Sequence, residues 1–204
     1  NHNGGGLFFG TDGFLYISFG DEGPGNNTYN NGQRINDRLM AGVLRIDVDR
    51  NPATSHAIRR QPNLLSGSDQ SYTANYYVPD SNPWQDVSGG ILEEFIAIGF
   101  RNPHRMTLDD ATGNIWLGDV GGWQFEEIDL ILPGHNYQWG FKEGFTGNGP
   151  QGPSPPSPFI GTSTDPIYTY PNTGGAAIVG GYVYRGSDHP DLLGKYIFAD
   201  NGSG

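Results

Sequence analysis

Two short apolar strands joined by a turn recur three times along this sequence. The three copies are GGGLFFGTDGFLYISFGDEG, RMTLDDATGNIWLGDVGG and GGYVYRGSDHPDLLGKYIFADNG. A further strand, in which apolar and acidic residues alternate, follows the first two copies at residues 43–49 and 125–132. Alternation with a period of two is typical of β-strands, and no stretch of helical length shows the periodicity of a helix. The predicted fold class is therefore all-β.

Units of this kind, repeated at intervals of roughly 80–100 residues with variable loops between them, indicate a β-propeller of four-stranded antiparallel blades. A propeller hides its strand edges by closing on itself. We expect about three to four blades, too few to close comfortably at this spacing, so residues 1–204 are predicted to be part of a single, larger propeller domain. Two long loops are predicted, at about 50–72 and at 147–166, where GPQGPSPPSPF indicates a polyproline-like segment.

The balance of charge limits the partners that the chain can have. It carries 22 acidic and 11 basic residues, a formal net charge of −11, and no cysteine. An acidic protein repels nucleic acid and anionic membrane surfaces, and it suits cations such as Ca²⁺. The absence of cysteine excludes thiol nucleophiles, thiolate metal sites and disulfides. No apolar run is long enough to predict a membrane span.

A polar stretch, GFRNPHR at residues 99–105, lies between two predicted strands. In a propeller the innermost strand of each blade lines the central channel, so the residues just before these strands gather at one mouth. His2 precedes the first inner strand, and Arg101, Asn102 and His104 lie where the second begins. We expect these side chains to meet at the channel mouth, where a small polar ligand could bind. From the residues alone, Arg-Asn-Pro could equally end a strand and bond to loop carbonyls.

Acidic pairs and a glycine pair were the other candidates for chemistry. Glu93-Glu94 and Glu126-Glu127 are neighbours in sequence, and neighbours on a strand point to opposite faces, so neither pair can act as one acid/base couple. We expect both pairs to be solvated charges. The stretch DVGGWQFEE lacks the spacing of an EF-hand; its glycines could present carbonyls to a cation or simply form a turn.

Taken together, the motifs resemble one family, the soluble quinoprotein glucose/aldose/sorbosone dehydrogenases, which use pyrroloquinoline quinone (PQQ). Hedgehog-interacting protein and its relatives share the domain. The resemblance extends from end to end and leaves the loops unmatched. The segments that carry it are NHNGGGLFFGTDGFLYISFGDEG, GVLRIDVDR, YYVPDSNPW, GFRNPHR, GNIWLGDVGGWQFEEIDLIL, GHNYQWGFKEG and GGYVYRG with GKYIFAD.

The resemblance implies a six-bladed propeller with PQQ and Ca²⁺ at the channel mouth. His2 matches the general base that takes the hydroxyl proton of the substrate. Arg101 and Asn102 match the pair that reaches the quinone, where a guanidinium stabilises negative charge. His104 matches a position where the glucose enzymes have a glutamine in contact with PQQ, and Asn1 a position where they have an aspartate. These two departures favour the sorbosone and Hedgehog-interacting branch.

The resemblance also implies two calcium sites. Gly121 and Gly122 match the residues whose backbone carbonyls hold the Ca²⁺ next to PQQ. Glu127 and Tyr137 match positions around a second, structural Ca²⁺.

Two functions follow from the resemblance. The first is a PQQ- and Ca²⁺-dependent dehydrogenase that oxidises a sugar or alcohol hydroxyl by hydride transfer to the quinone, passes electrons to an external acceptor and is periplasmic or secreted. The alternative is a non-catalytic propeller that recognises a protein or glycan partner through its loops. The presence of His2 together with Arg101 and Asn102 favours the enzyme. Basic residues on the inner strands of the next blades would favour the enzyme, and their absence would favour the binding module.

Overall fold

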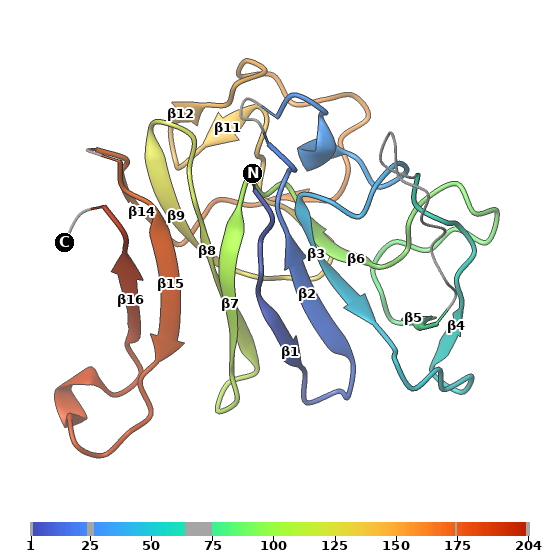
Figure 1. Ribbon diagram of the computed structural model, residues 1–204, viewed down its shortest axis with the longest axis horizontal. Coiled ribbons are helices and arrows are strands. Elements are labelled where there is room, and N and C mark those ends of the chain that lie inside the picture. The colour runs from blue at the N-terminus through green and yellow to red at the C-terminus, as the bar shows by residue number, and fades with distance from the viewer. Residues whose placement is uncertain (1, 24–26, 64–74, 174, 203–204) are drawn as a thin grey trace.

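A computed structural model describes residues 2–23, 27–63, 75–173 and 175–202 of the chain (Figure 1). Within these ranges the protein consists of strands and loops, with two short 3₁₀ helices, η1 (Asn31–Gln33) and η2 (Pro190–Leu192). None of the described helices is long and apolar enough to cross a membrane. The predicted all-β class is confirmed.

Each of the three sequence copies forms the first two strands of a separate antiparallel sheet. The first sheet has the order β1-β2-β3-β6 and continues with two short parallel strands, β10 and β13. The second has the order β7-β8-β9-β14, and the third consists of β15 and β16. The strands of the first sheet are β1 (Leu7–Phe9), β2 (Leu15–Phe19), β3 (Gly42–Ile46), β6 (Phe95–Ile98), β10 (His135–Asn136) and β13 (Thr162–Ser163). Those of the other two are β7 (Pro103–Asp109), β8 (Asn114–Asp119), β9 (Phe125–Leu130), β14 (Tyr168–Pro171), β15 (Ile178–Val183) and β16 (Tyr196–Asp200).

The described residues therefore contain two complete four-stranded blades and the first two strands of a third. Four further short strands pair in two hairpin-like sheets: β4 (Ser55–Ala57) with β5 (Tyr77–Pro79), and β11 (Lys142–Glu143) with β12 (Gly147–Asn148). The region predicted as a loop at 50–72 thus contains β4, and residues 64–74 lie outside the described ranges. The region predicted as a loop at 147–166 contains β12 and β13.

The first strands of the three sheets, β1, β7 and β15, lie side by side and run in the same direction (Figure 1). Gly6 lies against Met106, with no room for a Cβ between them, so β1 and β7 are in close contact. Thr107 donates a hydrogen bond of 2.9 Å to the carbonyl of Gly181, which joins β7 to β15. The segments that precede these strands consequently meet at one end of the sheets.

Apolar side chains fill the space between the first and second blades. The cluster includes Val43 and Ile96 from the first blade and Met106 and Leu117 from the second, and Phe100 at its centre is fully buried. The facing sides of the two sheets are covered, as expected when blades pack sheet against sheet.

An ion pair joins the second blade to the third. Arg185 donates from Nε to Asp109 Oδ1 at 2.9 Å and from Nη2 to Oδ2 at 2.5 Å, and Thr112 donates to the same carboxylate at 2.6 Å. The hydrogen bonds from Arg185 and Thr112 lower the pKa of Asp109 from 3.8 to about 2. Because the pKa is lowered on folding, the pair stabilises the fold above pH 3.8 and loses this effect as the pH falls towards 2.

We therefore expect Asp109→Asn to be less stable than the wild type at pH 5 and to approach it at pH 2. Urea unfolding at the two pH values measures the difference, with the exposed neighbour Asp110→Asn as the control. A gap of equal size at both pH values would show that the ion pair is not its cause.

Candidate functional site

Hydrogen bonds tie the segment before β1 to the segment before β7. The backbone N–H of Gly4 donates to Asn102 Oδ1 at 3.2 Å, and the N–H of Asp21 donates to the carbonyl of Arg101 at 2.8 Å. The structure thus brings His2 and the arginine–asparagine pair to the same end of the sheets.

Gly20 is the residue that permits this approach. A Cβ at this position would lie 2.3 Å from the carbonyl oxygen of His2 and 2.9 Å from that of Arg101. Any side chain here would push the two segments apart, since real Cβ contacts are never this short.

His2 is held by a buried aspartate. Its Nδ1 lies 2.5 Å from Asp21 Oδ1, which also accepts the N–H of Gly23, while Oδ2 accepts the indole N–H of Trp139 at 2.8 Å. Burial alone would raise the pKa of Asp21, but the hydrogen bonds from His2, Gly23 and Trp139 outweigh it and the pKa is lowered. The ionised carboxylate selects the tautomer with a proton on Nδ1, which leaves Nε2 of His2 free to accept one.

The Arg101 guanidinium lies over the ring of Trp139, with 5.6 Å between Cζ and the ring centroid. One of its terminal nitrogens, Nη1, donates to the carbonyl of Val120 at 3.0 Å. Its Nε is buried and has no partner among the described residues. The side chain is therefore fixed by two contacts and keeps a buried Nε–H donor that it does not use.

A second buried aspartate holds the backbone of this segment. Asp119 accepts the N–H of Arg101 at 2.9 Å on Oδ2 and the N–H of Asn102 at 2.6 Å on Oδ1. Burial raises the pKa of Asp119 to about 7, although the two backbone hydrogen bonds oppose the shift. Asp119 is the last residue of β8, and Asp21 comes shortly after the end of β2. In each of the two blades, a buried aspartate at the end of the second strand thus holds the residues that precede the inner strand.

Neither aspartate nor Trp139 was among the site residues predicted from sequence. The signal that could have found the aspartates is the Gly-Asp dipeptide, Gly20-Asp21 and Gly118-Asp119, which closes the second strand in both copies. Trp139 offers no comparable signal. Asn1 lies outside the described residues.

His104 is exposed and lies between two cavities at the same end of the sheets. Its Nδ1 is 3.4 Å from the carbonyl of Val179. One cavity, of about 260 Å³, is also lined by Asn102 and Val120 from the second blade and by Val179 and Asn201 from the third. The other, of about 310 Å³, is lined by residues 4–7 and by Tyr182. Asn102 and His104 thus face space that a small ligand could enter.

The glycine pair after β8 belongs to a turn built around a buried carboxylate. Glu143 Oε1 accepts four successive backbone N–H groups, at 2.7 to 3.2 Å; they belong to Gly122, Trp123, Gln124 and Phe125. At Gly121 a Cβ would lie 1.6 Å from the carbonyl oxygen of Phe125, so only glycine fits. The second oxygen of Glu143 is buried and has no partner in the described part of the chain.

The expectation that the two glutamate pairs are solvated is wrong. All four side chains are buried: Glu93, Glu94, Glu126 and Glu127. The reason lies in the architecture. Glu126 and Glu127 lie on β9, which packs between neighbouring strands and the third blade, and Glu93 and Glu94 lie in the turn before β6, under the β4–β5 segment, so all four must find partners inside the protein.

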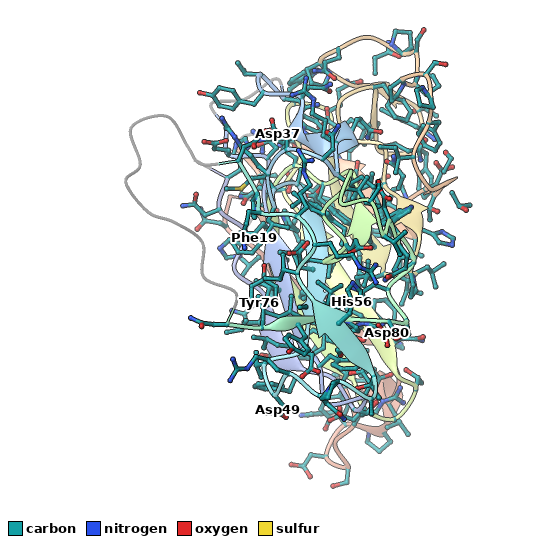
Figure 2. The ribbon with its side chains drawn as sticks, turned by 90° about the vertical axis from the view of Figure 1, so that its right-hand side faces the viewer. Phe19, Asp37, Asp49, His56, Tyr76 and Asp80 are labelled. Atoms are coloured by element: carbon teal, nitrogen blue, oxygen red, sulfur yellow. The ribbon has the colours of Figure 1, made fainter. Side chains whose placement is uncertain are left out.

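The first pair finds its partners in and next to β4 and β5. Glu93 Oε1 accepts Arg59 Nη1 at 2.7 Å, and its Oε2 is 3.0 Å from Nε2 of His56, whose Nδ1 is 2.8 Å from Asp80. Figure 2 shows His56 beside Asp80. Glu94 Oε1 accepts a hydrogen bond from the Tyr76 hydroxyl at 2.8 Å. These contacts give the first pair a structural role.

The second pair points to two different neighbours. Glu126 Oε2 accepts the N–H of Ile178 at 2.9 Å, at the start of β15. Glu127 Oε1 accepts the N–H of Gly144 at 2.5 Å. Burial raises the pKa of Glu127, and the nearby carboxylates of Asp129 and Asp119 raise it further.

Glu127 shares its face of β9 with a carboxylate that has no hydrogen bond. Asp129 is fully buried, and neither of its oxygens has a partner among the described residues. The hydroxyl of Tyr137 donates to the carbonyl of Leu130 and accepts the N–H of Leu132 at 3.0 Å, so it is engaged within the protein, and the backbone carbonyl is the group that Tyr137 could offer to a cation. In the described ranges no three His, Asp or Glu side chains converge on one metal position.

The profile of the family described as Glucose / Sorbosone dehydrogenase matches residues 67–200. The chain belongs to this family. The Arabidopsis thaliana HIPL2 protein, a relative, is 35% identical over 211 residues, which cover 97% of this chain and 28% of the relative. Mouse Hedgehog-interacting protein is 27% identical and is matched over 98% of this chain and 23% of its own length. The chain thus spans less than a third of these relatives.

Solved structures related to the glucose/sorbosone dehydrogenase family share the fold. A glucose dehydrogenase superposes with a TM-score of 0.63 at 25% identity, over 95% of this chain and 45% of its own. The PQQ-bound aldose sugar dehydrogenase of Streptomyces coelicolor superposes with a TM-score of 0.53 at 22% identity, over 89% and 42%. The second likeness concerns the fold alone.

Proposed function

We propose that this protein is part of a PQQ- and Ca²⁺-dependent dehydrogenase that oxidises a sugar or alcohol hydroxyl and passes the electrons to an external acceptor. The observation that carries the proposal is His2, oriented by buried Asp21 and placed beside the segment of Arg101 and Asn102. Family membership and the Streptomyces relative with PQQ bound support the choice of cofactor. We further propose one propeller domain, of which residues 1–204 are a part, that works in a periplasm or outside the cell.

The residues at the channel mouth fit a planar ligand rich in acceptor oxygens. Arg101 has a buried Nε donor without a partner in the described ranges, and Asn102 and His104 line open cavities. These three residues would hold PQQ. When bound, the cofactor supplies a quinone that accepts the hydride from the substrate carbon.

The part played by His2 follows from its hydrogen bond. Its Nε2 accepts the proton of the substrate hydroxyl as the hydride leaves the carbon. The Nδ1–H donates to Asp21, whose negative charge stabilises the imidazolium that results. Trp139 and Gly23 keep the carboxylate in place. Arg101 would stabilise the negative charge that develops on the group that accepts the hydride.

Unpaired buried carboxylate oxygens fit the proposed calcium ions. Glu143 has one such oxygen near Gly122, and Asp129 has two on the same face of β9 as Glu127. Carboxylates and backbone carbonyls are the ligands that Ca²⁺ prefers. Carbonyls of Gly121 and Gly122 would hold the ion at the mouth, and Glu127 with the Tyr137 carbonyl the structural one.

A titration of the full-length protein with PQQ, with and without Ca²⁺, tests the proposal. We expect binding only with Ca²⁺, followed by turnover of sugars or alcohols with an artificial electron acceptor. PQQ binding that is unaffected by chelation of Ca²⁺ would contradict the metal assignment, and the absence of binding would exclude the enzyme.

The alternative function is a binding module for a protein or glycan partner. The likeness to Hedgehog-interacting protein over nearly the whole chain favours it. This function predicts no PQQ binding, and a partner captured through the loops instead, so the same titration separates the two.

A further inference from the structure

A cavity of about 460 Å³ is lined by the β11–β12 hairpin and by the proline-rich segment that follows it. Figure 1 shows where this hairpin lies relative to the three sheets. Its volume is in the range of roughly 300–1,000 Å³ that small-molecule sites occupy. Its wall combines phenyl and proline rings with uncharged polar side chains, and it shares no residue with the cavities beside His104. The lining residues used below are Gln138, Phe141, Lys142, Phe145, Asn148 and Phe159.

The walls of this cavity are held by contacts within the protein. Gln138 donates to the carbonyl of Thr164 at 2.7 Å and to Asp165 at 2.9 Å. Phe141 and Phe159 meet edge to face, with 5.9 Å between ring centroids. Gln138 is buried and has a φ of 76°, a left-handed conformation that a residue with a side chain adopts only when its surroundings fix it. The site is therefore formed before any ligand arrives.

The electrostatics of the cavity favour an uncharged ligand. Its single cation, Lys142, is paired with Asp165 at 2.5 Å. The protein as a whole has a net charge of −11, which repels anions. No acidic side chain lines the cavity to attract a cation.

Three uncharged polar side chains around the cavity are available to a ligand. The hydroxyls of Thr146 and Ser163 and the amide of Asn148 are exposed and have no hydrogen-bond partner within the described residues. The ring of Phe145, 46% exposed, adds an apolar surface at the rim. A ligand that fits must combine an apolar face with several neutral hydroxyls.

We propose that this cavity binds a neutral carbohydrate. A sugar ring presents C–H groups on one face and hydroxyls around its edge; the face packs on Phe145 and the hydroxyls bond to Asn148, Thr146 and Ser163. The proposal goes beyond the dehydrogenase function, because the site needs neither PQQ nor His2.

Titration of the ¹⁵N-labelled, cofactor-free full-length protein with cellobiose and maltose tests the proposal. We expect saturable amide shifts confined to residues 141–163. Phe145→Ala and Asn148→Ala change exposed side chains and leave the fold intact, and each should weaken the affinity by roughly fivefold or more, the effect of one lost stacking contact or hydrogen bond. Val87→Ala, an exposed apolar side chain elsewhere, is the matched control and should change nothing.

His2→Ala should also leave saccharide binding unchanged, which separates this site from the proposed dehydrogenase site. The absence of shifts up to the solubility limit of both sugars would overturn the proposal. Shifts that appear with an uncharged proline-rich peptide, and not with sugars, would overturn the assignment of the ligand. If Phe145→Ala and Asn148→Ala both bind sugars as tightly as the wild type does, the proposed location of the site is wrong.

Discussion

Turnover by the complete, PQQ-loaded protein should fall by about 10²–10⁴-fold when His2 is replaced by alanine. The variant loses the nitrogen that accepts the hydroxyl proton, while Asp21 and Trp139 remain to keep the segment in place. The affinity for PQQ should change little, because the proposed cofactor contacts come from Arg101, Asn102 and His104. Dye-linked kinetics measure the first quantity and a PQQ titration the second.

The control for this prediction is His189→Ala. It removes an exposed histidine between β15 and β16 in the third blade, whereas His2 precedes the first blade. It should turn over as the wild type does. Equal rates for the His2 variant and the wild type would remove His2 from the mechanism. A loss of PQQ binding that matches the loss of turnover would instead make His2 part of the cofactor pocket.

The blades could be predicted from sequence because their information is local. Each copy carries two strands and the turn between them within about 20 residues, and alternation marks the third strand. The meeting of His2 with Arg101 and Asn102 followed from topology alone, since the inner strands of a propeller run in the same direction. Strands of two residues, such as β10 and β13, are too short for any pattern: β10 forms because β6 is there to pair with it, and β13 because β10 is.

The partners of the site residues could not be predicted in the same way. Trp139 reaches Asp21 across 118 positions of the chain, and no local pattern encodes such a contact. The error on the glutamate pairs has a related cause. Alternation shows which residues share a face, but only the tertiary structure decides whether the polar face meets water or another blade.

A buried carboxylate holds the start of each of the three inner strands. Asp21 binds His2 before β1, Asp119 binds the backbone of residues 101 and 102 before β7, and Glu126 binds Ile178 at β15. Buried ionisable groups are unfavourable unless they are compensated, so the presence of one at the start of each inner strand indicates that these segments must be fixed. Asp21 and Asp119 occupy equivalent places in their own blades, and Glu126 reaches β15 from the neighbouring blade. Asp119 provides the sharpest test, because both of its oxygens accept backbone N–H groups.

Asp119→Ala should lower the free energy of unfolding by about 2–6 kcal/mol, since two partly buried N–H donors are left without an acceptor at about 1–3 kcal/mol each. PQQ affinity should fall with it, because Arg101 and Asn102 are no longer held. Asp119→Asn retains one acceptor oxygen and should lie between the wild type and the alanine variant, while the exposed Asp191→Ala should match the wild type. Urea unfolding gives the stability of each variant.

Amide hydrogen exchange distinguishes a local effect of Asp119 from a general one. If the carboxylate acts by holding the channel mouth, the amides of Arg101 and Asn102 exchange faster in Asp119→Asn, and by a larger factor than the amides of β8 and β9 in the same variant. A uniform increase across the second blade would mean that Asp119 only stabilises the core. In that case the geometry of the channel mouth would depend on Gly20 and on the β1–β7 contact. PQQ affinity would then not vary with the number of acceptor oxygens at residue 119.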